Sequence, residues 1–201
     1  MTKYPKSFQN LINILNSLPG IGKKSAERLA FSVLNWNEDK LQAFSDIIND
    51  IQNKLDYCHE CGNIAEKNSL CVFCADMTRK REIICVVENV PQAMAVEAGG
   101  VFNGLYHVIG GKIAPLQGKN ADSLNIDSLK IRVQNENIKE VIIALGHDVE
   151  SRATSMYIST VLENFKIKVS IPARGLPAGS DITCADSATL AAAFSGRTII
   201  D

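Results

Sequence analysis

Residues 58–74 read CHECGNIAEKNSLCVFC, and the rest of the chain is interpreted outward from this stretch. Its cysteines form two C-x-x-C pairs, Cys58 with Cys61 and Cys71 with Cys74, with nine residues between the pairs. Each pair places two thiolates on one tight turn, and two such turns can supply the four sulfurs of a tetrahedral zinc site. The spacing predicts a small finger whose zinc is structural, because four protein ligands leave no open position for catalysis.

Two other interpretations of these cysteines are disulfide bonds and scattered core thiols. Nothing near Met1 resembles a signal peptide, so we expect a reducing, cytoplasmic setting, in which this pattern favours metal. His59 offers a substitute ligand, but the paired spacing favours four sulfurs. The two remaining cysteines, Cys85 and Cys184, stand alone and are expected to be packing residues.

Composition is that of a globular protein with one or two domains: 201 residues, 46% of them hydrophobic. No apolar run approaches the length that crosses a bilayer, so no membrane association is expected. The net charge of −1 does not itself indicate a nucleic-acid partner. Basic residues nevertheless gather in two places, residues 1–28 and Arg79-Lys80-Arg81, and such patches are either solvated surface or an anion-binding face.

The first third of the chain is expected to be helical. Apolar residues recur at the three-and-four spacing of an amphipathic helix over residues 8–18, 26–34 and 41–55. The third stripe consists of Leu41, Phe44, Ile48, Ile51 and Leu55. All three stripes are predicted to be core.

The break between the first two helices, residues 18–26, reads LPGIGKKSA and resembles the hairpin of the helix-hairpin-helix DNA-binding motif. Glycine leaves room for a phosphate to approach backbone N–H groups, and a helix N-terminus adds partial positive charge. The candidate DNA-binding residues are Gly20, Gly22, Lys23, Lys24 and Arg28. Contacts of this kind carry no sequence information, so binding should be non-specific and salt-sensitive. The alternative is an ordinary helix-capping turn.

From residue 82 onward, buried apolar runs of strand length alternate with helical patterns. This alternation predicts an α/β domain with a mostly parallel sheet covered by helices. Active groups collect beyond the carboxyl ends of such strands. Glu88 follows the first strand, and Asp148 and Glu150 follow the third.

An acid after one strand and an Asp-x-Glu pair after another resemble the Toprim domain of topoisomerases, primases and some nucleases. The resemblance implies that Glu88, Asp148 and Glu150 hold a magnesium ion for nucleotidyl or phosphoryl chemistry. The alternative is that they are solvated acids at strand ends, or contacts for a basic partner.

Taken together, the hairpin, the cysteines and the sheet resemble the bacterial recombination-mediator family RecR over nearly the whole chain. Further matching strings are YHVIGG at 106–111, RGLPAG at 174–179 and LAAAFSGR at 190–197. The resemblance implies a cytoplasmic, nucleoid-associated repair protein that is not an enzyme. It also implies a ring-like homotetramer that clamps DNA and works with RecO and RecF to load recombinase at gaps, with the RecO-type partner meeting the acidic strand ends.

The expected organisation has four parts along the chain. They are a helix-hairpin-helix region at 1–56, a four-cysteine zinc finger at 57–75, a Toprim domain at 81–176 and a C-terminal oligomerisation segment at 177–201.

One departure from the family concerns the acidic strand end. Where the family usually reads Thr-Val-Glu-Gly-Glu, residues 148–152 read DVESR. Arg152 is expected to compete with a cation for Glu150, which makes magnesium binding doubtful.

Three function classes remain open. A DNA-binding repair scaffold accounts for all the motifs. A Toprim-type nuclease or nucleotidyl-transfer enzyme would need a nucleophile or a fuller acidic cluster. A zinc-dependent interaction module without DNA contact would leave the glycine hairpin and its lysines unexplained.

Overall fold

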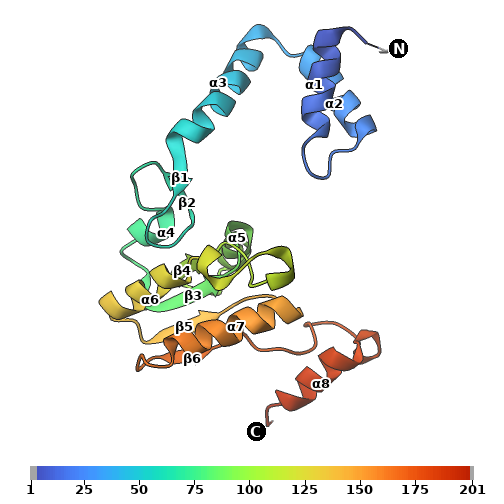
Figure 1. Cartoon of the computed structure of the whole chain (residues 1–201). Coiled ribbons are helices and arrows are strands. Elements are labelled where there is room, and N and C mark those ends of the chain that lie inside the picture. Colours follow the sequence, from blue (N-terminus) through green and yellow to red (C-terminus); the bar gives the residue numbers. More distant parts are fainter. Residues whose placement is uncertain (1–3, 200–201) are drawn as a thin grey trace. The chain divides into compact units, whose positions relative to one another are not determined.

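The computed structural model describes residues 4–199, which divide into two compact units between Leu55 and Asp56 (Figure 1). In the part of the chain so described, no helix is both long and apolar enough to span a membrane. The predicted α/β class is confirmed, with helices first, a cysteine cluster next and a parallel sheet after it.

The first unit contains helices α1 (Lys6–Asn16), α2 (Lys23–Leu34) and α3 (Glu38–Lys54). Helices α1 and α2 pack through Ile12, Ala26 and Ala30, and the small alanines let the helices approach closely. The aromatic rings of Phe8 and Phe31 extend this contact with their centroids 4.8 Å apart. Because its two flanking helices pack against each other, the hairpin between α1 and α2 is anchored at both of its ends.

Helix α3 corrects one prediction. Its apolar stripe was expected to be core, but no residue of α3 is buried. Leu41, Phe44, Ile48 and Ile51 are each at least 40% exposed. The helix still forms because Asn37 caps it, accepting a hydrogen bond from the Lys40 N–H at 3.1 Å. Amphipathic spacing predicted the helix but could not show what, if anything, covers its apolar face.

The second unit opens with strands β1 (Leu55–Tyr57) and β2 (Ile64–Glu66), which pair with each other. The short helix α4 (Val72–Ala75) follows. Strands β3 (Lys80–Val87), β4 (Gly104–Val108), β5 (Glu140–Ile143) and β6 (Lys168–Ser170) then form a parallel sheet in the order β4-β3-β5-β6. Helices α5 (Val90–Ala98), α6 (Ile126–Asn135) and α7 (Val149–Leu162) are the crossovers between these strands.

Alternation along β3 divides the core into two layers. Ile84 and Val86 face the layer that contains α6 and α7, while Cys85 and Val87 face the layer that contains α5 and the cysteine segment. Cys85 is buried, as predicted. The cysteine segment therefore packs on the face of the sheet that carries Cys85 and Val87, against β3 and β4.

Within the described residues, three short 3-10 turns and one further helix complete the second unit; two of the turns lie between β4 and α6, and the third precedes the last helix. The turns are η1 (Pro115–Gln117), η2 (Ala121–Ser123) and η3 (Ile182–Cys184), and the helix is α8 (Ser187–Ser195). Cys184 is exposed, so the prediction that it is a packing residue was wrong. It lies in η3, a turn that contributes no residue to the core.

Candidate functional site

The four cysteines of the two C-x-x-C pairs meet in one buried cluster. Their sulfur atoms all lie within 4.8 Å of one another, and each cysteine is at most 2% exposed. In the first turn the Gly62 N–H donates to the Cys58 carbonyl at 2.8 Å, and Gly62 has a φ of +72°. A Cβ at Gly62 would lie 2.7 Å from the Val108 carbonyl oxygen, so this turn requires glycine on two grounds.

The electrostatics of the cluster favour a bound cation. Hydrogen bonds from the Cys61 and Cys74 thiols lower the pKa of Cys71, and the same contacts raise the pKa values of Cys61 and Cys74. Sulfurs so close together cannot all ionise without a positive charge among them. Four buried soft donors at these distances match the ligand set of a structural metal ion, and the described residues offer no other group of this kind.

Arg132 supports this cluster, although no sequence motif singled it out. It extends from α6, is 5% exposed, and places Nη2 3.8 Å from the Cys74 sulfur. Its other nitrogens donate to the Tyr106 carbonyl and to Glu136, each at 2.9 Å. The sequence did contain one signal: Arg132 lies between Leu129 and Val133 on the apolar face of α6. A buried arginine needs a partner, so its position there indicates an interaction inside the protein.

The basic string Arg79-Lys80-Arg81 does not form a free patch. Arg79 lies over the ring of Phe73 and pairs with Glu97 and Asp76, and its side chain is only 8% exposed. Arg81 donates to the Cys74 carbonyl at 3.2 Å. These two arginines join the cysteine segment to the sheet rather than facing an outside anion, and only Lys80 of the three is exposed.

The hairpin of the first unit is open where a phosphate would approach. A Cβ built on Gly20 or on Gly22 would meet nothing within 4 Å. Gly20 has a φ of +80°, and Gly22 is the N-cap of α2 without a side-chain cap. The helical hydrogen bonds begin with the Ala26 N–H, so the N–H groups of the first turn remain available.

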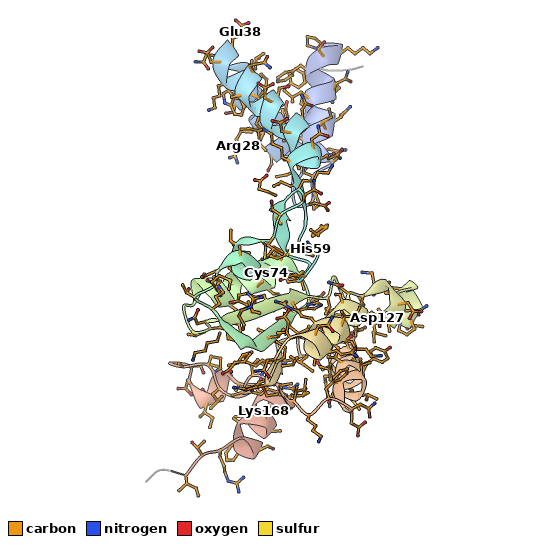
Figure 2. All side chains as sticks on the ribbon, turned by 90° about the vertical axis from the view of Figure 1, so that its left-hand side faces the viewer. Arg28, Glu38, His59, Cys74, Asp127 and Lys168 are labelled. Atoms are coloured by element: carbon orange, nitrogen blue, oxygen red, sulfur yellow. The ribbon has the colours of Figure 1, made fainter. Side chains whose placement is uncertain are left out.

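Cations surround this helix start. Lys23, Lys24 and Arg28 are all exposed, and Figure 2 labels Arg28 in the helical unit. Uncapped N–H groups, a helix dipole and exposed cations together form a surface suited to a phosphate.

A lysine lies among the acids at the carboxyl ends of the strands. Lys112 Nζ is 2.8 Å from an Asp148 oxygen and 3.9 Å from a Glu88 oxygen. Asp148 also caps α7, accepting from the Ser151 N–H at 2.8 Å. Its hydrogen bond from Lys112 is the main reason why the pKa of Asp148 lies far below its ordinary value.

Lys112, rather than Arg152, is thus the cation beside this acidic set. Arg152 forms no ion pair with Glu150 or with any other acid of residues 4–199, which corrects the expected competition. Lys112 follows Gly110-Gly111 after the end of β4. The expectation that functional groups lie beyond the carboxyl ends of parallel strands, which identified the acids, could therefore have identified Lys112 as well.

Comparisons with known protein families match three separate parts of the chain. The helix-hairpin-helix family of RecR matches residues 8–51, the Toprim domain family matches 82–173, and the C-terminal family of RecR matches 175–198. The recombination protein RecR of Staphylococcus aureus strain MRSA252 is 42% identical over 97% of this chain and 98% of its own length. The recombination protein RecR of Staphylococcus saprophyticus gives the same identity and coverage.

Proposed function

This chain belongs to the RecR family of recombination proteins, and from that premise we propose that it is a DNA-binding protein of recombinational repair that performs no chemistry on DNA. It would act as a ring or clamp, together with RecO- and RecF-type proteins, to load recombinase at gapped DNA. The observation that carries the DNA contact is the uncapped start of α2 beside an open glycine hairpin.

Contacts by Gly20, Gly22, Lys23, Lys24 and Arg28 would hold DNA through its phosphates. Binding should then be independent of sequence and fall steeply with salt. A salt titration of binding to duplexes of unrelated sequence tests this. Salt-insensitive or absent binding would favour the interaction module without DNA contact.

Zinc is the metal proposed for Cys58, Cys61, Cys71 and Cys74. Bound there, it would hold the segment folded and leave no position for a substrate. Purified protein should contain about one zinc per chain, and Cys58→Ser or Cys74→Ser should destabilise the segment. Structural zinc contributes on the order of 10–16 kcal/mol of apparent binding free energy in small peptides, so removal of one ligand should be felt well beyond the loop. Normal folding of both variants without metal would refute the assignment.

The absence of catalysis is proposed because Lys112 pairs with Asp148 and lies near Glu88, and because no three acids of the described residues come close enough together to hold a metal ion. The alternative is a Toprim-type metal-dependent nuclease or nucleotidyl-transfer enzyme. Plasmid incubated with magnesium or manganese separates the two. Cleavage that disappears in the Glu88→Ala and Glu150→Ala double variant would establish the enzyme.

The same acids suit a basic partner surface, and we assign the RecO-type contact to Glu88, Asp148 and Glu150. The double variant Glu88→Ala with Glu150→Ala should bind that partner more weakly while its affinity for DNA stays unchanged. An equal decrease in both affinities would instead indicate a damaged fold.

Self-association is proposed through the ends of the chain, giving a homotetramer. The exposed stripe of α3 and the exposed Phe194 of α8 are surfaces of the kind that oligomers bury. The proposed division remains 1–56, 57–75, 81–176 and 177–201, of which the first and the last reach beyond the described residues. Light scattering on Phe44→Glu with Ile48→Glu should give a smaller mass than the unaltered chain.

A further inference from the structure

Two arginines that have no ion-pair partner among the described residues line one hollow in the second unit. The hollow has a volume of about 440 Å³, and Arg152 of α7 and Arg174, which follows β6, both border it. Ser155 and Ser159 of α7 and Ser170 of β6 add hydroxyl groups, above apolar side chains such as Ile143. No carboxylate borders it within residues 4–199.

The hollow occupies a position typical of binding sites in parallel sheets. Ile143 ends β5 and Ser170 ends β6, so the floor lies at the carboxyl ends of two neighbouring strands. Residues 152, 155 and 159 follow the helical spacing that puts them on one face of α7. That face adjoins the buried one, which includes Thr154, Ile158 and Leu162.

The hydrogen-bond donors of the hollow are largely unused. Neither Arg152 nor Arg174 makes a side-chain hydrogen bond or ion pair within residues 4–199, and the Ser159 hydroxyl makes none either. Ser155 and Ser170 already donate, to the Ser151 carbonyl at 2.8 Å and to Glu140 at 2.6 Å. Two guanidinium groups and one hydroxyl therefore remain available for an anion.

The segment that carries Arg174 passes near the carboxyl end of α8. A Cβ on Gly175 would lie 3.7 Å from Ala193, and one on Gly196 would lie 3.7 Å from the Arg174 carbonyl oxygen. The backbone around Arg174 therefore lies close to the last helix.

We propose that this hollow binds the phosphate backbone of DNA, as a second contact separate from the hairpin; the proposal rests on the DNA binding proposed above. Arginine forks match phosphate oxygens, and a hydroxyl adds a neutral donor. Successive phosphates of one strand are spaced closely enough for arginines from two elements to take one each. An acidic peptide is the competing ligand, and measuring DNA and partner affinities side by side separates the two.

The test is a salt titration of DNA binding by Arg152→Glu with Arg174→Glu in the full chain. The slope of log affinity against log salt should fall by about 0.9 for each phosphate that is no longer neutralised, with the hairpin lysines still present. The matched control is Lys130→Glu with Lys166→Glu, which changes the net charge equally. Both control lysines are exposed and make no ion pair among the described residues, and neither borders the hollow. Arg152→Lys with Arg174→Lys should retain most of the slope.

Each outcome decides a different point. A smaller slope in the arginine variant, with the control unchanged, supports the second contact. Equal slopes in the arginine variant and the control overturn it and leave the hairpin proposal intact. Unaltered protein that binds no DNA overturns the proposed function itself. Weaker binding of a partner protein at unchanged DNA affinity would assign the hollow to an acidic peptide and also overturn the proposal.

Discussion

Arg132 Nη2 lies 3.8 Å from the sulfur of Cys74, and this contact joins helix α6 to the cysteine cluster. Both residues are buried. A divalent cation held by four thiolates leaves net negative charge in the protein interior, and buried charge is costly unless it is compensated. With a metal ion bound, Arg132 would supply that compensation, and its hydrogen bond to the Tyr106 carbonyl ties it to the sheet. The cluster and the sheet should therefore depend on each other for stability.

The first prediction concerns zinc retention. Arg132→Met should release zinc faster to a chromogenic chelator and lower the affinity by about 10- to 100-fold, the usual effect of removing a partner of a metal ligand. It should also lower the free energy of unfolding by about 3 kcal/mol or more, because the Tyr106 carbonyl and Glu136 lose their donor. Arg132→Lys keeps the charge, so its zinc affinity and its free energy of unfolding should lie between those of Arg132→Met and those of the unaltered chain.

Lys130→Met is the matched control, because Lys130 lies on the same helix and is exposed. Zinc release from Arg132→Met at the rate of the control would show that the arginine has no influence on the cluster.

How much the sequence could predict depended on whether the signal was local. The C-x-x-C spacing, the glycine hairpin and the alternation of strands and helices are properties of short segments, and each appears in the structure at the predicted place. Strand ends were less well defined by the sequence: the apolar run of residues 141–145 continues two residues beyond the end of β5 at Ile143.

Ion pairs between residues that are far apart in the sequence were not predicted. Arg79 was grouped with its sequence neighbours as a basic patch, yet Glu97, 18 residues away, is its ion-pair partner. Lys112 pairs with Asp148 across 36 residues of sequence. The α3 stripe was wrongly assigned to the core because periodicity reports an apolar face, not what covers it.

The second prediction concerns the cation between the strand ends. Lys112→Met should leave Glu88 and Asp148 close together without compensation, so magnesium should raise the melting temperature of the variant more than that of the unaltered chain. Without magnesium the free energy of unfolding should change little, because solvent screens an exposed ion pair. Lys112→Arg keeps the charge and serves as control. Equal stabilisation of all three proteins by magnesium would contradict a blocking role for Lys112.

The third prediction is a pH dependence from His107. Its Nε2 lies 2.7 Å from the Asn125 carbonyl, its Nδ1 has no partner among the described residues, and burial lowers its pKa to about 4. A pKa below the unfolded value of about 6.5 means that the neutral ring stabilises the fold. This stability is complete above about pH 6.5 and is lost as the pH falls toward 4, by up to about 1.4 kcal/mol per pH unit.

Urea unfolding of the zinc-loaded protein between pH 7 and pH 5 measures this decrease. His107→Gln keeps a side-chain donor but cannot titrate, so its free energy of unfolding should change less over the same range. Protonation of the zinc ligands affects both proteins and cancels in the difference. Parallel pH curves for the two would exclude His107 as the source.

The last prediction concerns the hairpin lysines. Lys23→Glu with Lys24→Glu should weaken DNA binding and lower the log–log salt slope by roughly 0.9 for each phosphate left without a cation. Both side chains are exposed, so the free energy of unfolding should change by less than about 0.5 kcal/mol. Lys130→Glu with Lys166→Glu, carrying the same change in net charge, controls for the overall field. Affinity is measured by anisotropy at several salt concentrations. An unchanged log–log salt slope in the hairpin variant would mean that DNA is held elsewhere, and the hollow bordered by Arg152 and Arg174 would be the next site to test.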